Sequence, residues 1–115
     1  MGSTIEDQQL DALFTALSDR TRRDIVSRLS TGEATVKELA EPYAMSMQAV
    51  SQHIRVLERS GLISQGRHRQ TRPCRLEPAA LETAVSWIED SRRAWSDRMD
   101  RLETHLARLQ ERENQ

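Results

Sequence analysis

A seven-residue hydrophobic repeat in the C-terminal third is the feature that most limits how this chain can fold. One series of the repeat consists of Leu81, Ile88, Trp95, Leu102 and Leu109. A second series consists of Val85, Arg92, Met99 and Leu106, in which Arg92 is the polar member. Spacing of this kind places apolar side chains along one face of a helix, and Pro78 suits the first turn of that helix. We therefore predict one long helix over about residues 78–111.

The length of this apolar stripe also predicts a partner. A chain of 115 residues buries only a modest core. One alternative is an amphipathic helix that packs entirely on its own domain. Because a domain of this size cannot cover a stripe of about four heptads, we predict that the long helix pairs with a second copy of the chain.

Two helices are predicted before residue 30. Residues 5–17 carry apolar side chains at helical spacing, namely Leu10, Leu13, Phe14 and Leu17. Ser18 and Asp19 then offer N-cap chemistry for a second helix. The inward side chains of that second helix are predicted to be Ile25, Val26 and Leu29.

Two further helices are predicted around a tight turn in residues 35–60. A capping box at Thr35 and Glu38 begins a short third helix. Ser46 is a suitable N-cap for the fourth helix, and Gly61 is a suitable stop. The predicted inward face of the fourth helix consists of Met47, Val50, Ile54 and Leu57. Its predicted outward face consists of Gln48, Gln52, Arg55 and Arg59, with Ser51 and His53 on the flanks.

Residues 62–76 favour a β-hairpin. The first strand begins at Leu62 and Ile63, residues 66–70 form the tip, and residues 71–76 return. Pro73 predicts an edge position for the returning strand, because proline cannot donate a hydrogen bond to a neighbour. Strand alternation puts Cys74 on the side of Leu76, which we expect to face the core. Neighbouring arginines would favour a reactive thiolate, but we expect Cys74 to be a small buried residue.

The charge of the chain is concentrated in its middle. The net charge is only −1, yet residues 46–76 carry six basic side chains and one acidic side chain, a net charge of +5. The segments on either side are each acidic, at −3. Two short helices around a tight turn, followed by a basic hairpin, are typical of a winged helix-turn-helix. A solvated basic loop is the alternative interpretation.

We therefore predict a mainly α fold with a small β-hairpin wing, in a single domain over residues 1–115. The helix-turn-helix would occupy about residues 35–60 and the wing about residues 62–76. The major groove of DNA admits one helix, where glutamine pairs with adenine and arginine with guanine. Arginines of the wing would hold phosphates or probe the minor groove. The predicted DNA-binding residues are Ser46, Gln48, Ser51, Gln52, His53, Arg55, Arg59, Arg67, Arg69 and Arg72.

The sequence resembles the ArsR family of bacterial transcriptional repressors over about residues 10–109. The matching segments are Ala16-Leu17-Ser18-Asp19, Thr21-Arg22-Arg23-Asp24-Ile25, Val36-Lys37-Glu38-Leu39-Ala40, Ala49-Val50-Ser51-Gln52-His53-Ile54-Arg55-Val56-Leu57 and Gly61-Leu62-Ile63. The segment from Arg72 to Pro78, followed by Trp87 and Trp95, is similar to the branch that lacks metal-binding boxes. One departure is Arg20, which stands where the family usually has proline.

This resemblance implies a bacterial cytoplasmic repressor that binds a two-fold symmetric operator in double-stranded DNA as a homodimer. It also implies release by an inducer, whose identity the sequence does not give. The family dimerises through its first and last helices, the same surface that the heptad repeat predicts. The predicted dimer interface consists of Leu10, Phe14, Leu81, Val85, Ile88, Trp95, Met99, Leu102 and Leu106.

Metal sensing and catalysis are not expected. Metal-sensing relatives carry Glu-Leu-Cys-Val-Cys-Asp-Leu where this chain has residues 33–39, so Thr35 and Lys37 replace both cysteines. Neither is a soft thiolate ligand. Glu103-Thr104-His105 resembles the start of a second family metal site, but the chain ends before its remaining ligands. Three scattered histidines and one cysteine form no grouping of nucleophile and base. We expect no enzyme activity, no metal and no cofactor.

Two other interpretations are open at this point. A winged-helix protein-interaction module would dimerise through its last helix and no longer bind DNA, but it would have no reason to retain the +5 segment. A MarR-type dimer is less favoured, because those chains usually extend further at the N-terminal side. We find no apolar run long enough to span a membrane and no signal peptide, and therefore expect no membrane partner.

Overall fold

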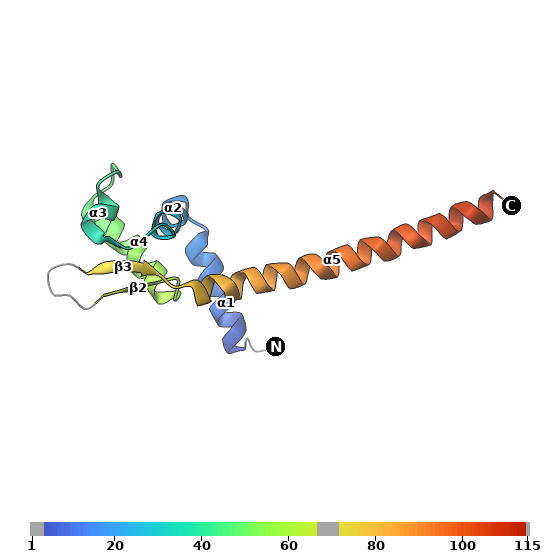
Figure 1. Cartoon of the computed structure of the whole chain (residues 1–115), viewed down its shortest axis with the longest axis horizontal. Helices are drawn as coiled ribbons and strands as arrows, with labels where there is room; N and C mark the ends of the chain where they lie inside the picture. The colour runs from blue at the N-terminus through green and yellow to red at the C-terminus, as the bar shows by residue number, and fades with distance from the viewer. Residues whose placement is uncertain (1–3, 67–71, 115) are drawn as a thin grey trace. The chain divides into compact units, whose positions relative to one another are not determined.

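The computed structural model describes residues 4–66 and 72–114, which form five helices and three short strands (Figure 1). In chain order the elements are α1 (Ile5–Leu17), α2 (Arg20–Leu29), β1 (Ala34–Thr35), α3 (Val36–Ala40), α4 (Met47–Arg59), β2 (Ile63–Gln65), β3 (Pro73–Leu76) and α5 (Pro78–Glu113). This order confirms the predicted mainly α fold with a small β-hairpin. Backbone contacts divide the chain into two units, Met1–Ala84 and Val85–Gln115.

Side-chain caps fix where the helices begin. The Asp19 carboxylate accepts a hydrogen bond from the backbone N–H of Arg22 at the start of α2 (3.1 Å). Thr35 and Glu38 form the predicted capping box of α3, and the Ser46 hydroxyl accepts from Ala49 at the start of α4. Each cap satisfies a backbone N–H that has no partner within its helix. The three predicted helix starts are thereby confirmed.

Gly61 lies just after α4 and acts as its stop, as predicted. It follows Ser60, the C-cap of α4, and adopts a φ of +86°. This left-handed conformation is strained for residues that carry a Cβ atom and is common directly after helices. The chain can therefore turn sharply from α4 into β2.

The three strands form one antiparallel sheet in the order β1-β3-β2. The prediction that the strand of Pro73 lies at an edge is wrong, because β1 pairs with its free side through Ala34↔Cys74 and Thr35↔Pro73. Pro73 is tolerated because it is the first residue of β3 and lies beyond the last paired residue of β2, Gln65. The two-residue strand β1 is too short to be recognised from its sequence.

Helix α4 lies at the centre of the core of the first unit. Val50, Ile54 and Leu57 are each at most 1% exposed, and α1, α2, α3 and β2 all contact this helix. Burial of such a side chain stabilises a fold by roughly 1.5–3 kcal/mol. Met47 is 50% exposed, so the prediction that it faces inward is wrong. It lies in the first turn of α4, before the part of the helix that packs on the core.

The core of the first unit as a whole confirms most of the residues that were predicted to face inward. It consists of Leu13, Ala16, Ile25, Val26, Leu29, Leu39, Val50, Ile54, Leu57, Leu62, Ile63, Cys74, Ala80 and Ala84. Cys74 is fully buried, as strand alternation predicted. Leu81, the first member of the heptad repeat, is half-buried against this core. Of the predicted interface residues in α1, Leu10 is half-buried and Phe14 is 36% exposed.

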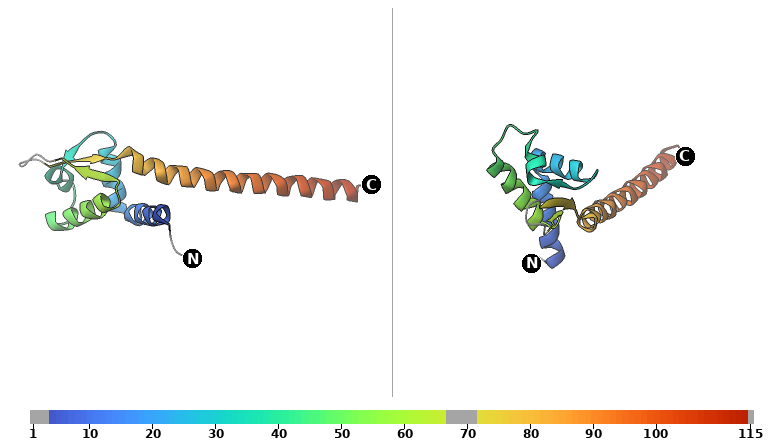
Figure 2. Two further views of the ribbon diagram at one scale, coloured as in Figure 1. Left: turned by 90° about the horizontal axis from the view of Figure 1, so that it is seen from below. Right: turned by 60° about the vertical axis from the view of Figure 1, so that its left-hand side comes forward.

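Helix α5 is one unbroken helix, which confirms the predicted long helix (Figure 2). Within Val85–Gln115 its apolar stripe is exposed to between 42% and 62%, at Val85, Ile88, Trp95, Leu102, Leu106 and Leu109. Met99 is half-buried. Arg92, the polar member of the repeat, donates to the Glu89 carboxylate within the same helix (2.8 Å). No helix within residues 4–66 and 72–114 is long and apolar enough to cross a membrane.

Candidate DNA-binding surface

The outward face of α4 presents polar side chains that have no partner within the described part of the chain. Gln48, Gln52, Arg55 and Arg59 are all exposed. No hydrogen bond or ion pair joins their side chains to other residues in 4–66 or 72–114. The opposite face of the same helix is fixed in the core. These four predicted DNA-binding residues therefore lie on a rigid element with their polar groups free to contact another molecule.

Two shallow hollows show which of the predicted residues the fold brings together. The first lies along the start of α4 and includes Ser46, Gln48, Ser51, Gln52 and Arg55 in its lining. The second lies between α4 and the base of the β2–β3 hairpin and is lined by Val36, Ser51, Ile54, Arg55, Glu58, Gln65, Gly66 and Arg72. Ser51 and Arg55 line both hollows. The outward face of α4 and the base of the hairpin thus form one continuous surface.

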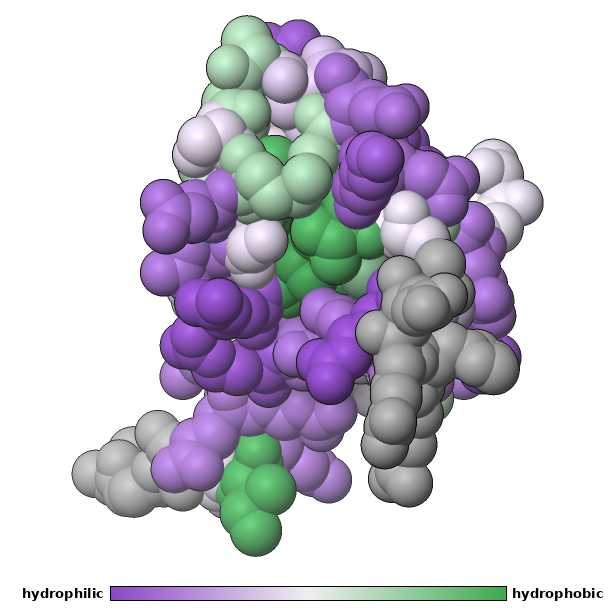
Figure 3. Space-filling model, turned by 90° about the vertical axis from the view of Figure 1, so that its left-hand side faces the viewer, coloured by the Kyte–Doolittle hydropathy of each residue, from purple (hydrophilic) through white to green (hydrophobic). Residues whose placement is uncertain are grey.

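The base of the wing is held closely against its return strand. The Gly66 backbone N–H donates to the Pro73 carbonyl (2.9 Å), and a Cβ atom at position 66 would lie 3.1 Å from the proline ring. Arg72 directly precedes this contact and is exposed. Figure 3, which views the side that lies at the left of Figure 1, shows hydrophobic residues enclosed by hydrophilic ones. Arg67 and Arg69, also predicted to bind DNA, lie outside the described residues.

The charge on this surface is positive because its arginines are not neutralised within the described chain. Arg55, Arg59 and Arg72 have no carboxylate within ion-pair distance among residues 4–66 and 72–114. Arg75, in β3, pairs with Glu33 instead (3.3 Å). Glu58 is the one acidic residue of the segment 46–76 and lines the hollow beside Arg55 and Arg72. A surface of this kind attracts a polyanion.

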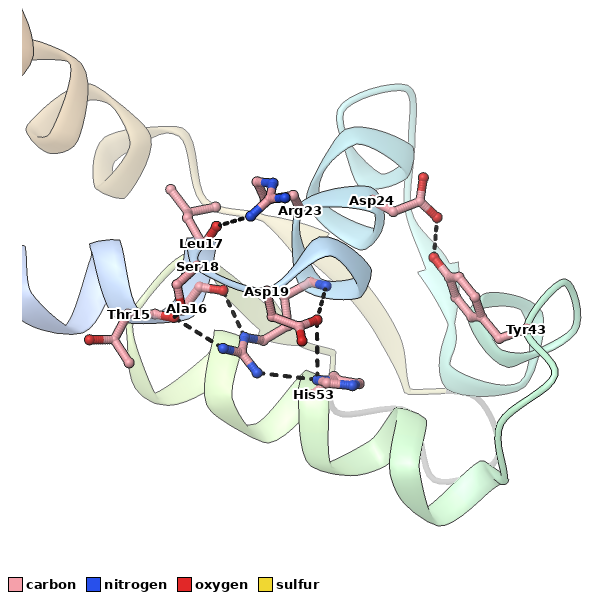
Figure 4. Close-up of polar contacts among 10 residues, drawn as sticks. Thr15, Ala16, Leu17, Ser18, Asp19, Arg23, Asp24, Tyr43 and His53 are labelled. Atoms are coloured by element: carbon pink, nitrogen blue, oxygen red, sulfur yellow. Dashed lines mark hydrogen bonds and ion pairs between the residues drawn. The ribbon is translucent and has the colours of Figure 1, made fainter.

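His53, on the flank of α4, has a partner inside the protein. Its Nδ1 atom lies 3.2 Å from an Arg22 guanidinium nitrogen and 3.9 Å from an Asp19 carboxylate oxygen (Figure 4). The side chain is 23% exposed. The backbone N–H of Arg22 donates to Asp19 and holds the pKa of that carboxyl below its usual value. Arg22 was not identified as a functional residue from the sequence. The only indication was that Arg22 belongs to the segment 21–25, which supports the family resemblance.

A second cluster fixes the turn before α4. Arg28 donates to the backbone carbonyls of Leu39 (2.8 Å) and Glu38 (3.1 Å) at the end of α3. Its guanidinium also lies over the ring of Tyr43, whose hydroxyl donates to the Asp24 carboxylate. Burial is the main reason that the pKa of Tyr43 is raised. These contacts join α2 to the helix-turn-helix, and nothing in the sequence pattern indicated them.

Three residues bear on metal or redox chemistry, namely Thr35 and Lys37 at the family's metal position and Cys74 in the hairpin. The Thr35 hydroxyl accepts from the backbone N–H of Glu38 in the capping box, and Lys37 is exposed. No three His, Cys, Asp or Glu side chains among the described residues lie close enough together to hold a metal ion. Burial raises the pKa of the Cys74 thiol to about 11. This thiol therefore stays protonated at neutral pH, which disfavours thiolate chemistry.

Comparisons with known proteins identify helix-turn-helix transcriptional regulators as relatives of this chain. A helix-turn-helix domain family matches residues 17–65, which include α2, α3, α4 and β2. The transcriptional repressor SdpR of Bacillus subtilis is 30% identical over 79 residues, covering 69% of this chain and 88% of the relative.

Solved structures share the fold. The crystal structure of an ArsR family transcriptional regulator matches with a TM-score of 0.75 at 35% identity, covering 84% of this chain and 97% of the other. The homodimeric winged helix-turn-helix DNA-binding domain of a possible ArsR-family regulator from Mycobacterium bovis matches with a TM-score of 0.60. This domain is 21% identical to the chain, and the match covers 81% of the chain and 92% of the domain. Because the identity is low, the likeness concerns the fold alone. The chain belongs to the ArsR family of helix-turn-helix transcriptional regulators.

Proposed function

We propose that this protein is a homodimeric, sequence-specific DNA-binding repressor whose DNA binding is not controlled by metal ions. The observation that carries the proposal is the outward face of α4. Its glutamine and arginine side chains are exposed and unpartnered within the described chain, while the opposite face is fixed in the core. A rigid helix with free amides and guanidiniums meets the requirements for reading the major groove.

The two parts of the surface would perform different tasks. Gln48, Gln52 and Arg55 occupy the outward face of α4, from which side chains reach base edges. Arg72, at the base of the hairpin, would hold a phosphate and so position the helix. We assign the same task to Arg67 and Arg69 from the sequence alone. Ser46, Ser51 and Arg59, at the ends and flank of α4, complete the proposed contact surface.

The proposed dimer rests on the apolar stripe of α5. Large side chains such as Trp95 and Leu102 are about half exposed or more, and burying them against a second copy would remove apolar surface from water. We include Leu10 and Phe14 of α1 in this interface because the family dimerises through its first and last helices. A two-fold symmetric dimer presents two copies of α4, which implies an operator with two-fold symmetry.

Repression would follow from this geometry. A dimer bound across promoter DNA blocks access by polymerase, and SdpR, a relative that 69% of this chain matches, is itself a repressor. A ligand that disturbs the pairing of the two copies would release the operator. The protein-interaction module remains the competing proposal, and DNA-binding measurements separate the two.

Substitutions in the stripe should dissociate the dimer. We expect Trp95→Glu or Leu102→Glu to shift the protein towards monomer at micromolar concentration, because the new carboxylate would be buried unpaired. The matched control is Thr104→Glu, which adds the same charge on the opposite side of α5. Light scattering and operator binding are measured for each variant. A monomeric wild type, or equal effects of Thr104→Glu and Leu102→Glu, would contradict the proposed interface.

Metal ions should leave DNA binding unchanged. Thr35 and Lys37 offer no thiolate at the family's metal position, and Cys74 is buried. We expect operator affinity with zinc, cadmium or arsenite to equal that of the metal-free protein within about twofold. Cys74→Ser is the control for adventitious thiol chemistry. A tenfold change that persists in Cys74→Ser would show that a metal site exists elsewhere.

Base-reading and phosphate-holding residues should respond differently to truncation. Gln52→Ala should cost about 1–3 kcal/mol on the operator and relax the preference at one position in each half-site. Arg72→Ala should weaken operator and random DNA alike and reduce the salt slope by about one for each phosphate that the side chain neutralises. Arg101→Ala, which removes one charge from α5, is the matched control.

Titrations on operator and scrambled duplexes at several salt concentrations distinguish these outcomes. If Gln52→Ala weakens both duplexes equally while Arg72→Ala changes sequence preference, the two roles are reversed. If neither substitution matters and Arg101→Ala behaves like both, α4 is not the reader and the protein-interaction module gains support.

A further inference from the structure

Three helices meet at the Arg22 side chain. Its Nε atom donates to the Ala16 carbonyl (2.7 Å) and one terminal nitrogen donates to the Thr15 carbonyl (3.0 Å), both at the end of α1. Its other terminal nitrogen faces His53 Nδ1 of α4 (3.2 Å). Arg22 itself belongs to the first turn of α2. The Arg22 guanidinium thus joins α1, α2 and α4.

The chemistry of this contact determines where the proton of His53 lies. A guanidinium carries N–H donors and no acceptor. At 3.2 Å the Arg22 nitrogen must donate, so Nδ1 of His53 must offer its lone pair. A neutral imidazole then carries its proton on Nε2. The Asp19 oxygen, at 3.9 Å from Nδ1, is beyond hydrogen-bond distance and does not compete for this atom.

We propose that Arg22 is a positioning residue that fixes His53 as the Nε2–H tautomer, so that His53 donates a hydrogen bond to a DNA phosphate. This inference rests on the proposed function, because it requires α4 to lie in the DNA groove. The Arg22 side chain already makes hydrogen bonds to two backbone carbonyls and to the His53 imidazole. Its role is therefore to orient the donor, and His53 makes the contact.

The position of His53 favours phosphate over base. It lies between Gln52, on the outward face, and Ile54, which is 1% exposed in the core. A helix in the major groove turns its outward face to the base edges and its flanks to the sugar–phosphate walls. The ring is 23% exposed. Its Nδ1 atom is turned towards Asp19 (Figure 4) and lies 3.2 Å from an Arg22 nitrogen. Nε2, on the other side of the ring, is the atom left to contact a ligand.

The same contact would transmit the position of α1 to α4. The Arg22 bonds to Ala16 and Thr15 hold the end of α1, a helix that we include in the dimer interface. A shift of α1 relative to α2 would alter these bonds and the one to His53 together. If α1 takes part in the dimer as proposed, the phosphate contact would be coupled to the geometry of the dimer.

A double-mutant cycle on operator affinity tests the proposal. We expect His53→Ala to weaken binding roughly tenfold, because each dimer loses two hydrogen bonds. Arg22→Met should weaken binding by a similar factor, and the double variant should lose no more than His53→Ala alone. The matched control is Arg23→Met. Arg23 also donates to the end of α1, at the Leu17 carbonyl (2.8 Å), but it does not contact His53. The operator affinity of Arg23→Met should therefore stay within about twofold of the wild-type affinity.

Imidazole nitrogen shifts from NMR measure the tautomer directly. The wild type should show His53 protonated at Nε2. In Arg22→Met the Asp19 carboxylate becomes the nearest polar partner of Nδ1, so the proton should move towards Nδ1. His53→Gln, whose amide supplies a donor without Arg22, should retain most of the operator affinity. These two measurements, on wild type and on His53→Gln, also decide the matter if Arg22→Met fails to fold.

Several results would overturn the proposal while leaving the proposed function intact. The first is a wild type that binds the operator but carries the His53 proton on Nδ1. The second is additive losses of operator affinity in the double-mutant cycle. The third is a loss of operator affinity in Arg23→Met equal to that in Arg22→Met. A failure of the proposed function would differ, because the wild type itself would then not discriminate operator from scrambled DNA.

Discussion

The burial of one face of α4 is the constraint on which the rest of the structure depends. Val50, Ile54 and Leu57 are almost fully buried, and α1, α2, α3 and β2 all contact α4. Because the apolar positions occupy one side of the helix, the glutamines and arginines must occupy the other. The proposed reading surface is thus a direct consequence of how the core is packed.

Two groups of arginines in the first unit differ in their partners. Arg22, Arg23 and Arg28 are held by backbone carbonyls at helix ends. Arg55 and Arg72 have no such partner within the described residues and line the hollow beside the wing. The first group joins the ends of helices, and we propose that the second contacts the negative charge of DNA. Net charge alone, at −1, conceals this division.

Local signals in the sequence were sufficient for most of the fold. The N-caps at Asp19, Thr35 and Ser46 and the glycine at position 61 acted through adjacent backbone groups, so their positions could be predicted. The central position of β3 was missed because it depends on a two-residue strand that is remote in sequence. The Arg22–His53 contact was missed for the same reason, since it joins residues 31 positions apart.

Selection of bound duplexes from a pool of random DNA sequences tests the central claim most directly, because it presupposes no operator. The account predicts enrichment of an inverted repeat whose half-sites lie about 10 base pairs apart, or a multiple of that, centre to centre. It further predicts that Gln52→Ala relaxes one position in each half-site. Recovery of no sequence preference, or of a single half-site without its symmetric copy, would contradict a dimer that reads DNA through α4.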